Sequence, residues 1–570
     1  MRSDQLSPQT RGEALARMAS RQFDIVIIGG GVTGAGAALD AVTRGLSVAL
    51  VEARDYSSGT SSRSSKLIHG GVRYLEQMNF TLVREALKER SLLLQRLAPH
   101  LVRKVPFLFP FSHHVWERFY IGCGLMMYDS IGGAGAVPHH RHLTRTGALR
   151  LAPALKKEAL IGALQYYDAQ VDDSRLVSTL VRTASYYGAA VASSARVVGL
   201  LREGERVAGV RVRDLEGGNE IEVAGRQVIN ATGVWTDDIQ ELVGGRGRFQ
   251  VRASKGIHLV VPKDRIHSDT GIILRTEKSV LFIIPWGRHW LIGTTDTDWN
   301  LDKAHPAASA ADIDYLLDHV NSILRIPLTR EDVEGTYAGL RPLLAGENEA
   351  TSQLSREHAV AQPVAGLTVI AGGKFTTYRV MGKDAVDVAT NALEGVPPSC
   401  TENVPLLGAE GYEACFNNRE NIARESGLHV ARVEHLLKRY GSLIYELIEL
   451  IKAEPELAEP IEGADDYLKV EARYAASHEG ALHLDDILTR RTRIYMETWD
   501  RGLAAAPVIA RLVAPVLGWK PADIDREVEY YTLRVKAERE SQDQQDDLTA
   551  DAARLGAPDV RMGSAAVPVA

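Results

Sequence analysis

A glycine-rich turn near the amino terminus carries the first residues whose spacing has a chemical meaning. The turn Gly29-x-Gly31-x-x-Gly34 follows a short apolar run, and Glu52 comes 21 residues after the middle glycine. The three glycines permit, in order, a tight turn, close approach of the backbone to a pyrophosphate, and close helix–strand packing. A helix N-terminus binds anions through its free N–H groups, and an acidic side chain binds ribose hydroxyls. The pattern predicts a dinucleotide site, and Glu52 favours NAD or FAD over NADP.

Two later turns favour FAD as the dinucleotide. Val228–Gly233 is a predicted strand that ends in Ala231, Thr232 and Gly233, small residues that let the backbone approach a cofactor a second time. Gly372-Gly373-Lys374 predicts a second helix N-terminus. Such a terminus stabilises the negative charge that develops on a reduced isoalloxazine ring. Together with the first turn, these features make FAD the expected cofactor.

The elements around the first turn form a strand, helix, strand unit. Phe23–Ile28 is a β-branched apolar run, small and apolar residues predict a helix up to Gly45, and Ser47–Val51 is a second apolar run. Helical spacing also predicts helices over Thr81–Leu97 and from Arg175 to about Tyr187. The segment therefore has the pattern of a βαβ unit with a parallel sheet.

The middle of the chain has the pattern of antiparallel strands. The runs and the turns between them are Arg206–Asp214, 216–219, Glu220–Ile229, Ser279–Ile284, 285–287 and His289–Thr294. Alternating apolar runs joined by short glycine-containing turns predict hairpins. We expect them to form a separate sheet above a bound substrate. Leu367–Ile370 and a helical pattern to about Leu393 then return the chain to its first sheet.

These patterns divide the chain into five segments. We expect an N-terminal arm (1–22), an oxidoreductase core with an inserted substrate sheet (23–395), a linker (396–409), an α-helical domain (410–540) and a disordered tail (541–570). The prediction of the helical domain is based on amphipathic runs such as Val430–Ile451 and Ala481–Trp499. The predicted fold class is α/β: a Rossmann-like FAD-binding domain interleaved with an antiparallel-sheet substrate-binding domain, followed by an all-α C-terminal domain.

The composition excludes several classes of protein. The 570 residues include 66 Lys or Arg and 73 Asp or Glu, a net charge of −7, and 45% are apolar. A chain of this kind has ample apolar residues for sizeable cores, and its mild acidic balance gives no electrostatic case for binding a nucleic-acid duplex. Three widely spaced cysteines, Cys123, Cys400 and Cys415, form neither a disulfide framework nor a metal motif. They indicate a reducing, intracellular setting.

The sequence predicts no membrane-spanning segment, because no window approaches about 18 uncharged apolar residues. Residues 1–22 also lack the apolar core of a secretory signal. Phe119–Ile131, with its aromatic and neighbouring basic residues, is the best candidate for a surface contact with lipid headgroups. A half-buried helix at a domain interface is the alternative. The cluster at 490–493 reads as a solvated helix face, with anionic lipid or a neighbouring subunit as the other options.

A series of motifs in a fixed order resembles the FAD-dependent glycerol-3-phosphate dehydrogenases. The longest is the run from Thr60 to Glu76, TSSRSSKLIHGGVRYLE. The others are Tyr128-Asp129, Val171–Leu176, Asn230–Gly233, Ile283–Trp286, Ile292–Asp296, Gly339–Leu343, Gly372–Arg379 and, more weakly, Asp486–Thr492. The likeness spans residues 23–395, and the ends of the chain lie outside it.

The resemblance implies oxidation of sn-glycerol 3-phosphate to dihydroxyacetone phosphate, with FAD taking a hydride and a membrane quinone reoxidising it. It implies a cytoplasmic enzyme held peripherally on the inner face of the cell membrane; it leaves homo-oligomerisation open. It also places the segment Ser61–Leu67 along the cofactor. The expected FAD-binding residues are Gly29, Gly31, Gly34, Glu52, Ser61, Ser62, Ser65, Lys66, Leu67, Ala231, Thr232, Gly233, Gly373, Lys374 and Thr376.

The same resemblance assigns the substrate-facing positions, and their chemistry fits a phosphate ester. These positions are His69, Arg73, Tyr74, Lys255, His258, Arg341, Arg356 and Lys374. A phosphomonoester carries a charge of about −1.5 to −2, and the forked guanidinium groups of the three arginines suit it. Oxidation at C2 also needs a base for the hydroxyl proton, for which His69 and His258 are the candidates. Arg341 or Lys374 would stabilise the developing alkoxide.

Three other functions remain compatible with parts of this pattern. A glycerophosphate oxidase would share the reduction of the flavin but pass the electrons to O₂. A flavin amine oxidase would not need three arginines, and a binding module with vestigial chemistry would not need His69, Arg73, Arg341 and Lys374 together. No metal site is expected, because Asp296 and Asp298 have no histidine at metal-like spacing.

Overall fold

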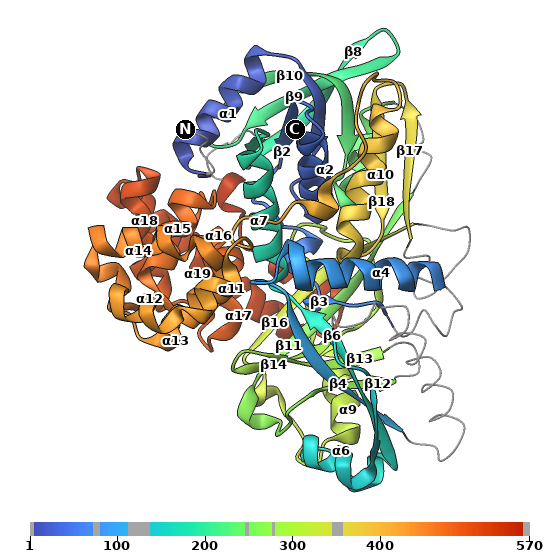
Figure 1. The fold of residues 1–570 in the computed structure, drawn as a ribbon, viewed down its shortest axis with the longest axis vertical. Coiled ribbons are helices and arrows are strands. Elements are labelled where there is room, and N and C mark those ends of the chain that lie inside the picture. The colour runs from blue at the N-terminus through green and yellow to red at the C-terminus, as the bar shows by residue number, and fades with distance from the viewer. Residues whose placement is uncertain are drawn as a thin grey trace.

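A computed structural model describes residues 5–71, 80–111, 137–244, 250–275, 280–344 and 357–562. In Figure 1 a first sheet with its helices lies above a second sheet, and an orange-to-red helical domain lies beside both. The predicted α/β fold with a helical C-terminal domain is therefore confirmed. The expected surface segment, Phe119–Ile131, lies outside the described residues.

The first sheet is built on five parallel strands. In order across the sheet they are β18 (Leu367–Gly372), β10 (Glu220–Asn230), β1 (Phe23–Ile28), β2 (Val48–Val51) and β7 (Ala190–Ala192). The edge strand β17 (His358–Val364) pairs with β18 antiparallel, and β8 (Ala195–Glu203) and β9 (Arg206–Asp214) continue the sheet from β10. The βαβ unit and the hairpin between β9 and β10 are as predicted.

Both faces of this sheet are covered, which explains why its strands are apolar throughout. Ile25 and Ile27 of β1 pack against the face that carries helices α2 (Val32–Thr43), α7 (Asp173–Tyr186) and α10 (Tyr378–Thr390). Val26 and Ile28 pack against the other face, with helix α1 (Pro8–Ser20) and the β8–β9 hairpin. The N-terminal arm is thus a helix that belongs to the core of the first sheet.

The second sheet, which the sequence predicts as the roof over a substrate, has ten strands among the described residues. Its main order is β15 (Thr297–Trp299), β11 (Val251–Pro262), β14 (His289–Gly293), β13 (Val280–Trp286), β12 (Gly271–Arg275), β4 (Arg103–Phe111), β6 (Gly162–Gln170) and β3 (Leu67–Ile68). Strand β16 (Gly335–Leu344) pairs with β11, and β5 (Arg141–Thr144) pairs with β6. The pair of β12 with β4 is parallel, so the expected antiparallel sheet is in fact mixed.

Helices cover the second sheet and connect the parts of the core. Helices α6 (Arg145–Leu151) and α9 (Ala310–Ile323) pack on one face of the sheet, and α4 (Phe80–Leu92) packs on the other. The helix expected over Thr81–Leu97 ends as a π-helical turn, Leu93–Leu97. The short helix α8 (Thr236–Glu241) follows β10 at the edge of the first sheet.

The C-terminal domain is helical with one small hairpin. Its elements are α11 (Tyr412–Asn417), α12 (Arg419–Ser426), α13 (Val430–Tyr440), α14 (Ile444–Ala453), β19 (Pro460–Ile461), β20 (Ala464–Leu468), α15 (Lys469–His478), α16 (Leu484–Asp486), α17 (Ile494–Glu497), α18 (Ala505–Leu517), α19 (Pro521–Asp543) and α20 (Asp547–Arg554). The run Val430–Ile451 forms two helices, because Gly441 stands between them with a positive φ of 59°. Ala481–Trp499 is likewise broken, by the π-helical turn Ile487–Arg491.

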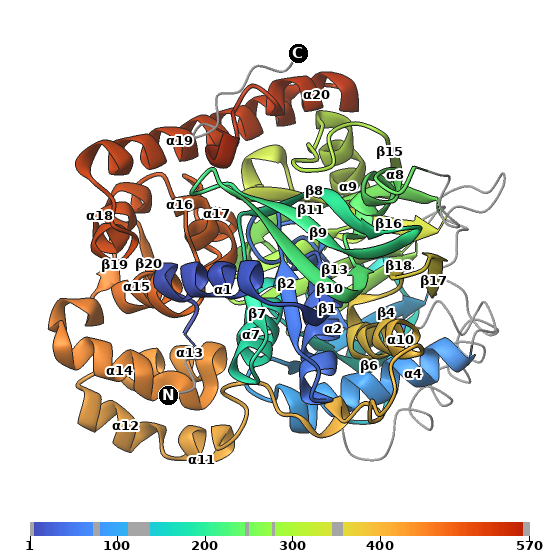
Figure 2. The same cartoon turned by 90° about the horizontal axis from the view of Figure 1, so that it is seen from above.

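The prediction of a disordered tail from residue 541 is wrong for the residues up to Met562. Helix α19 continues to Asp543, and α20 follows directly; Figure 2 shows both helices along one side of the molecule, reaching towards α9 and β15. Ala550 is fully buried, and Asp547 forms a 2.5 Å ion pair with Lys255 of β11. Charged side chains of this segment form ion pairs with the core, such as that of Asp547 with Lys255. Amino-acid composition alone does not reveal such pairs.

The arginines at 490–493 are not a solvated helix face. Arg490 and Arg491 both bind Asp55, whose side chain is fully buried. Arg493 binds Asp173 of α7 and, at 2.6 Å, Asp172. The C-terminal domain is therefore docked onto the core through a buried charge network. The segment expected as a linker also joins the core, since Leu406 packs in the cluster below the first sheet.

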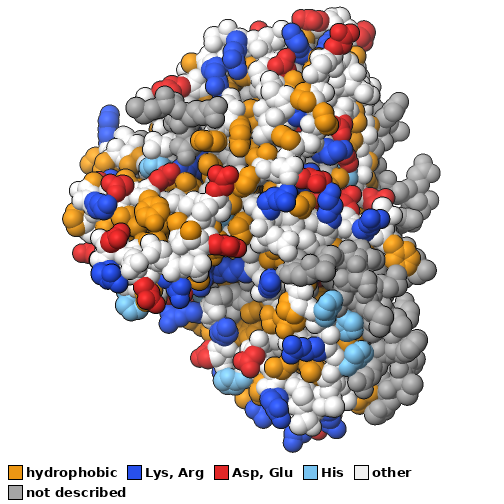
Figure 3. Space-filling model, viewed as in Figure 1, with side chains coloured by type: hydrophobic (Ala, Val, Ile, Leu, Met, Phe, Trp, Pro, Cys, Tyr) orange, Lys and Arg blue, Asp and Glu red, His pale blue; other side chains and the backbone are white. Residues whose placement is uncertain are grey.

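Surface charge and hydropathy add two observations. On the face seen in Figure 3, side chains of both signs are interspersed, with scattered apolar atoms between them. Within the described ranges, no helix combines the length and the apolar character that crossing a bilayer requires.

Candidate functional site

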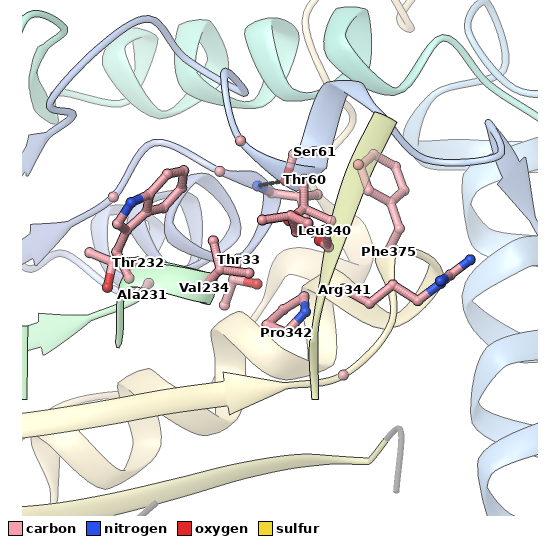
Figure 4. Close-up of a pocket in the computed structure, with 18 of the residues that line it drawn as sticks. Thr33, Thr60, Ser61, Ala231, Thr232, Val234, Leu340, Arg341, Pro342 and Phe375 are labelled. Carbon is pink, nitrogen blue, oxygen red and sulfur yellow. Dashed lines mark hydrogen bonds between the residues drawn. The ribbon is translucent and has the colours of Figure 1, made fainter. Parts of the chain in front are cut away.

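A cavity of about 570 Å³ lies where the first sheet meets the second. It has the size of a small-molecule or cofactor pocket. Figure 4 shows its walls: Thr33, Thr60 and Ser61 come from the amino-terminal unit, Ala231, Thr232 and Val234 from the end of β10, and Leu340, Arg341 and Pro342 from β16. Segments more than 300 residues apart in the chain thus form one site.

The glycine turn forms one wall of the cavity. Gly29 has a φ of 108°, and a Cβ on Gly34 would lie 1.9 Å from the carbonyl oxygen of Gly29. Gly31, Val32 and Thr33 line the cavity at the start of α2. Because the N-cap residue Gly31 has no side chain, the positive end of the helix is open to an anion at this wall. Gly34 does not line the cavity. Because it has no side chain, the turn at Gly29 can pack closely against the helix.

Glu52 is held in place by the backbone around it. Its two carboxylate oxygens accept hydrogen bonds from the N–H groups of Gly30 (2.6 Å) and Arg54 (2.9 Å). Burial raises the pKa of this carboxyl group, while both hydrogen bonds act in the opposite direction. The side chain lines the cavity at the end of β2, where the sequence predicts a ribose contact.

The two later turns meet the same cavity. The side-chain oxygen of Asn230 accepts hydrogen bonds from the N–H (3.2 Å) and the hydroxyl (2.6 Å) of Thr232, which shapes the turn after β10. Gly373 follows β18 with a φ of 90°. Thr376 then accepts a hydrogen bond from the N–H of His69 at 3.1 Å. The turns therefore bring backbone from both ends of the core to one place.

His258 lies in the wall that β11 contributes. Its Nε2 is 2.8 Å from the hydroxyl of Ser65, and its ring stacks on Tyr337 with centroids 4.7 Å apart. Its Nδ1 is buried and has no hydrogen-bond partner among the described residues. Burial, followed by the charges of Lys66 and Arg341, holds the pKa of His258 well below its ordinary value. The imidazole is therefore neutral at physiological pH.

Arg341 projects from β16 into the same space (Figure 4). Its guanidinium donates hydrogen bonds to the hydroxyl of Thr294 (3.1 Å) and the carbonyl of Thr295 (3.2 Å), and it lies 3.6 Å from the carboxylate of Asp296. The side chain keeps 23% of its surface exposed, so it is anchored yet accessible from the cavity. A fork of this kind suits a phosphate or carboxylate.

His69 and Lys374 complete a group of four side chains around the cavity. Both line it, together with His258 and Arg341. His69 packs edge-on against Phe282, with ring centroids 6.3 Å apart. The group combines two imidazoles with two fixed cations, a set that can orient an anionic substrate and move a proton.

Some expected site residues lie elsewhere. Lys255 is fully buried and binds Asp312 and Asp547, both at 2.5 Å, outside the cavity wall. Lys66 is also fully buried and pairs with Asp173 at 2.9 Å, so it supports the loop of residues 54–66, the cofactor loop, rather than lining the cavity. Ser62, in the same loop, is buried and does not line the cavity. Arg73, Tyr74 and Arg356 lie outside the described residues.

Two contacts that hold the site were not predicted. The hydroxyl of Thr60 donates a 2.5 Å hydrogen bond to the carbonyl of Leu340, which ties the cofactor loop to the strand that carries Arg341. Asp55 ties the same loop to the C-terminal domain. The available signal for Asp55 was its position three residues after Glu52. The arginines that bind Asp55 are more than 400 residues away in the sequence, so nothing nearby indicates them.

The residues present fit a dinucleotide cofactor such as FAD. Gly29 and Gly31 line the cavity without side chains, so a pyrophosphate can approach the backbone of this wall. The hydroxyl of Ser61 accepts a 3.0 Å hydrogen bond from the N–H of Val32 and so holds its loop against the turn. No group of three metal-binding side chains occurs in the described parts of the chain.

Comparisons with known proteins agree with this fit. Residues 24–387 match the FAD dependent oxidoreductase family, and residues 399–524 match the C-terminal domain of alpha-glycerophosphate oxidase. The chain is 61% identical to a glycerol-3-phosphate dehydrogenase of Mycobacterium leprae over 98% of its own length and 95% of that protein. It is 35% identical to the mitochondrial glycerol-3-phosphate dehydrogenase of mouse, over 94% of this chain and 76% of the mouse protein.

A solved structure shows the same architecture. The glycerol-3-phosphate dehydrogenase of Bacillus halodurans, complexed with FAD, superposes with a TM-score of 0.78 at 28% identity and covers 94% of this chain and 98% of the other. The α-glycerophosphate oxidase of Mycoplasma pneumoniae shares the fold, with a TM-score of 0.54 at 18% identity over 68% of this chain and 99% of that one.

Proposed function

Because the chain belongs to the family of FAD-dependent glycerol-3-phosphate dehydrogenases, we propose that it oxidises sn-glycerol 3-phosphate at C2 by hydride transfer to FAD and passes the electrons to a membrane quinone. The observation that carries this proposal is the convergence of His69, His258, Arg341 and Lys374 on the cavity that the glycine turn also lines. When bound, FAD supplies the two-electron acceptor for this reaction.

The phosphate of the substrate binds to Arg341 in this proposal. Its guanidinium is held by Thr294, Thr295 and Asp296 and faces the cavity, so little side-chain entropy is lost on binding. Each charge-assisted hydrogen bond contributes about 1.5–3 kcal/mol. Arg73 and Arg356 are proposed as the further phosphate ligands. Lys374 stabilises the negative charge that develops on the C2 oxygen.

We assign the removal of the C2 hydroxyl proton to His258. Its ring is neutral, which is the form that accepts a proton, and the hydroxyl of Ser65 fixes its orientation. Burial and the positive charges of Lys66 and Arg341 oppose its protonation in the free enzyme. The two negative charges of a bound phosphate offset those cations, so proton uptake is favoured only when substrate is present. His69 is the alternative base.

Anaerobic flavin reduction tests these roles. Glycerol 3-phosphate should bleach the flavin of the wild-type holoenzyme, and His258→Gln should slow this step by about 10²–10⁴-fold. His267→Gln is the matched control, because His267 is exposed and outside the cavity. Slow reduction in His69→Gln with normal reduction in His258→Gln would reassign the base. Normal rates in both variants would contradict the mechanism.

The electron acceptor is tested in the same experiment. The reduced enzyme should be reoxidised by a quinone in detergent and release little peroxide with O₂. Stoichiometric peroxide at the rate of substrate use would favour the alternative function, a glycerophosphate oxidase, which the match of residues 399–524 keeps open.

We further propose that the enzyme works at the inner face of the cell membrane, because a lipid-soluble quinone must be met at the membrane surface. Binding to anionic vesicles that weakens at high salt is the expected result of cosedimentation. Absence of binding at low salt would contradict this location.

A further inference from the structure

A second, smaller cavity of about 50 Å³ lies between the cofactor loop and the C-terminal end of the chain. Its walls come from the cofactor loop (Arg54, Ser58 and Arg63), from α19, and from the segment after α20. Six arginines line it, against three carboxylates. The lining residues that carry charge are Arg54, Arg63, Arg490, Arg534, Arg554, Arg561, Asp485, Glu527 and Asp559.

Part of this charge is already neutralised inside the protein. Arg490 binds Asp55 and Asp486, and Arg561 also binds Asp486. Glu527 is engaged at 2.9 Å by His483, so it does not serve the arginines. Asp485 is shared, because it binds both Arg490 and Arg534. Asp559 is shared by Arg54 at 3.6 Å and His305 at 3.7 Å.

Two arginines of this cavity have no carboxylate partner among the described residues. Arg63 donates one hydrogen bond, to the carbonyl of Ala304 at 3.0 Å, and forms no ion pair with any described residue. Arg554 is 5% exposed, and its one hydrogen bond goes to Nδ1 of His305 at 3.4 Å. Within the described chain it too has no acidic side chain within ion-pair distance. Burying an arginine without a counter-charge is unfavourable unless an anion is nearby.

Burial, and after it the surrounding positive charge, shifts the pKa values of the neighbouring groups. Burial, and then the charge of Arg554, lower the pKa of Arg534 to about 9. Burial lowers the pKa of Arg63 to about 10, and nearby arginines act in the same direction. Burial holds the pKa of His305 well below its ordinary value; the hydrogen bond that His305 donates to Asp559 opposes this, and the charge of Arg554 adds to it. A small anion between these groups would raise all three pKa values and so stabilise their charged forms.

We propose that Arg63, Arg534 and Arg554 form a binding site for a small oxyanion such as inorganic phosphate in the second cavity. This cavity adjoins the larger one, because Arg63 lines both, but it does not include the substrate group of His69, His258, Arg341 and Lys374. Guanidinium forks match the oxygens of phosphate, and phosphate carries up to two negative charges. Because Arg63 belongs to the cofactor loop while Arg534 and Arg554 belong to α19 and α20, the bound anion ties the C-terminal end of the chain to the loop beside FAD. Its binding stabilises the holoenzyme.

The test must separate this site from the phosphate subsite of the substrate. The Arg341→Gln holoenzyme removes the main substrate-phosphate ligand and serves as the background. Its melting temperature should rise by about 1–2 °C when phosphate, at about tenfold over its Kd, replaces chloride at equal ionic strength. Adding Arg554→Gln should abolish this shift. Adding Arg526→Gln should preserve it, because Arg526 is an exposed arginine of α19 that pairs with Asp523.

Two further outcomes decide the interpretation. If Arg554→Gln purifies with less FAD than wild type, the arginines serve the phosphates of the cofactor and the proposal is overturned. If Arg554→Gln does not fold, equilibrium dialysis of the Arg341→Gln holoenzyme with radioactive phosphate replaces it. One bound phosphate per chain that an excess of unlabelled glycerol 3-phosphate does not displace supports the site; no bound phosphate, or one that is displaced, overturns it. Loss of substrate oxidation in the Arg341→Gln background bears only on the proposed function.

Discussion

Replacing Asp55 by Asn tests whether the C-terminal domain holds the cofactor loop through buried charge. The side chain of Asp55 is fully buried. Its Oδ2 accepts hydrogen bonds from Arg490 (2.5 Å) and Arg491 (2.8 Å), and its Oδ1 accepts one from Arg491 (2.6 Å). Arg490 keeps Asp485 and Asp486 after the change, whereas Arg491 loses its ion pair with residue 55. Among the described residues its guanidinium then has neutral acceptors, the carbonyl of Glu479 at 3.0 Å and the remaining amide oxygen at position 55.

The expected loss of unfolding free energy arises because Arg491 stays charged and buried without a negatively charged partner. Arg491 is fully buried, and removing one partner of a buried ion pair destabilises a protein by about 3–5 kcal/mol. Because Asp55 lies three residues after Glu52 on the loop beside the cavity, the loosened loop should also release FAD. We expect unfolding and flavin release to shift together.

Urea denaturation of the holoenzyme, followed by circular dichroism and by the fluorescence of released flavin, measures both effects. Glu449→Gln is the matched control, since its 2.7 Å pair with Lys452 is largely exposed and should contribute less than about 1 kcal/mol. The double variant Asp55→Asn/Arg491→Gln should be less destabilised than the sum of its single changes. A loss in Asp55→Asn no larger than in the control would refute the reasoning.

Three further predictions follow from individual residues. Gly34→Ala should yield protein without FAD, because the added Cβ would meet the carbonyl oxygen of Gly29 at 1.9 Å; Gly12→Ala, with nothing within 4 Å, should purify with normal flavin absorbance. The lowered pKa of His258 keeps its ring neutral, so flavin reduction should stay constant as pH falls from 8 to 6; an inflection near 6.5 that His258→Gln removes would contradict this. Burial lowers the pKa of His483, but hydrogen bonds with two glutamates raise it to about 9, so its charged form stabilises the fold fully below pH 6.5 and no longer above about 9. Its replacement by Gln should therefore lower the unfolding free energy by about 3 kcal/mol at pH 6 and by little at pH 9.5, and an equal loss at both pH values would argue against the assignment.

Local sequence patterns were sufficient to predict the strands and turns whose conformation depends on residue types close together in the chain. Phe23–Ile28 reads as a strand from its β-branched residues and is one, and the glycine spacing after it requires a turn onto a helix. The strands β9 and β10 and the turn between them also follow from alternation and turn residues. Such features depend on neighbours within a few residues, so composition and periodicity determine them.

Long-range pairing of charges was the part that the sequence did not reveal. A lysine with the chemistry of a phosphate ligand, Lys255, is instead neutralised by Asp312 and by Asp547, 292 residues away. Arg491 reads as a surface charge, yet it is buried against Asp55 across 436 residues. Neither pairing leaves a periodic signal, because only packing decides which charges lose water together.

The sequence by itself therefore determined the strand–turn–helix unit, the order of the two sheets and the residue types that the site needs. Tertiary structure decided which of them face one cavity. It placed His258 between Ser65 and Tyr337, directed Arg341 into the space beside the glycine turn, and removed Lys255 from that space. The physical reason is that side-chain chemistry is fixed by residue type, whereas charge, burial and reach depend on what the fold packs against each side chain.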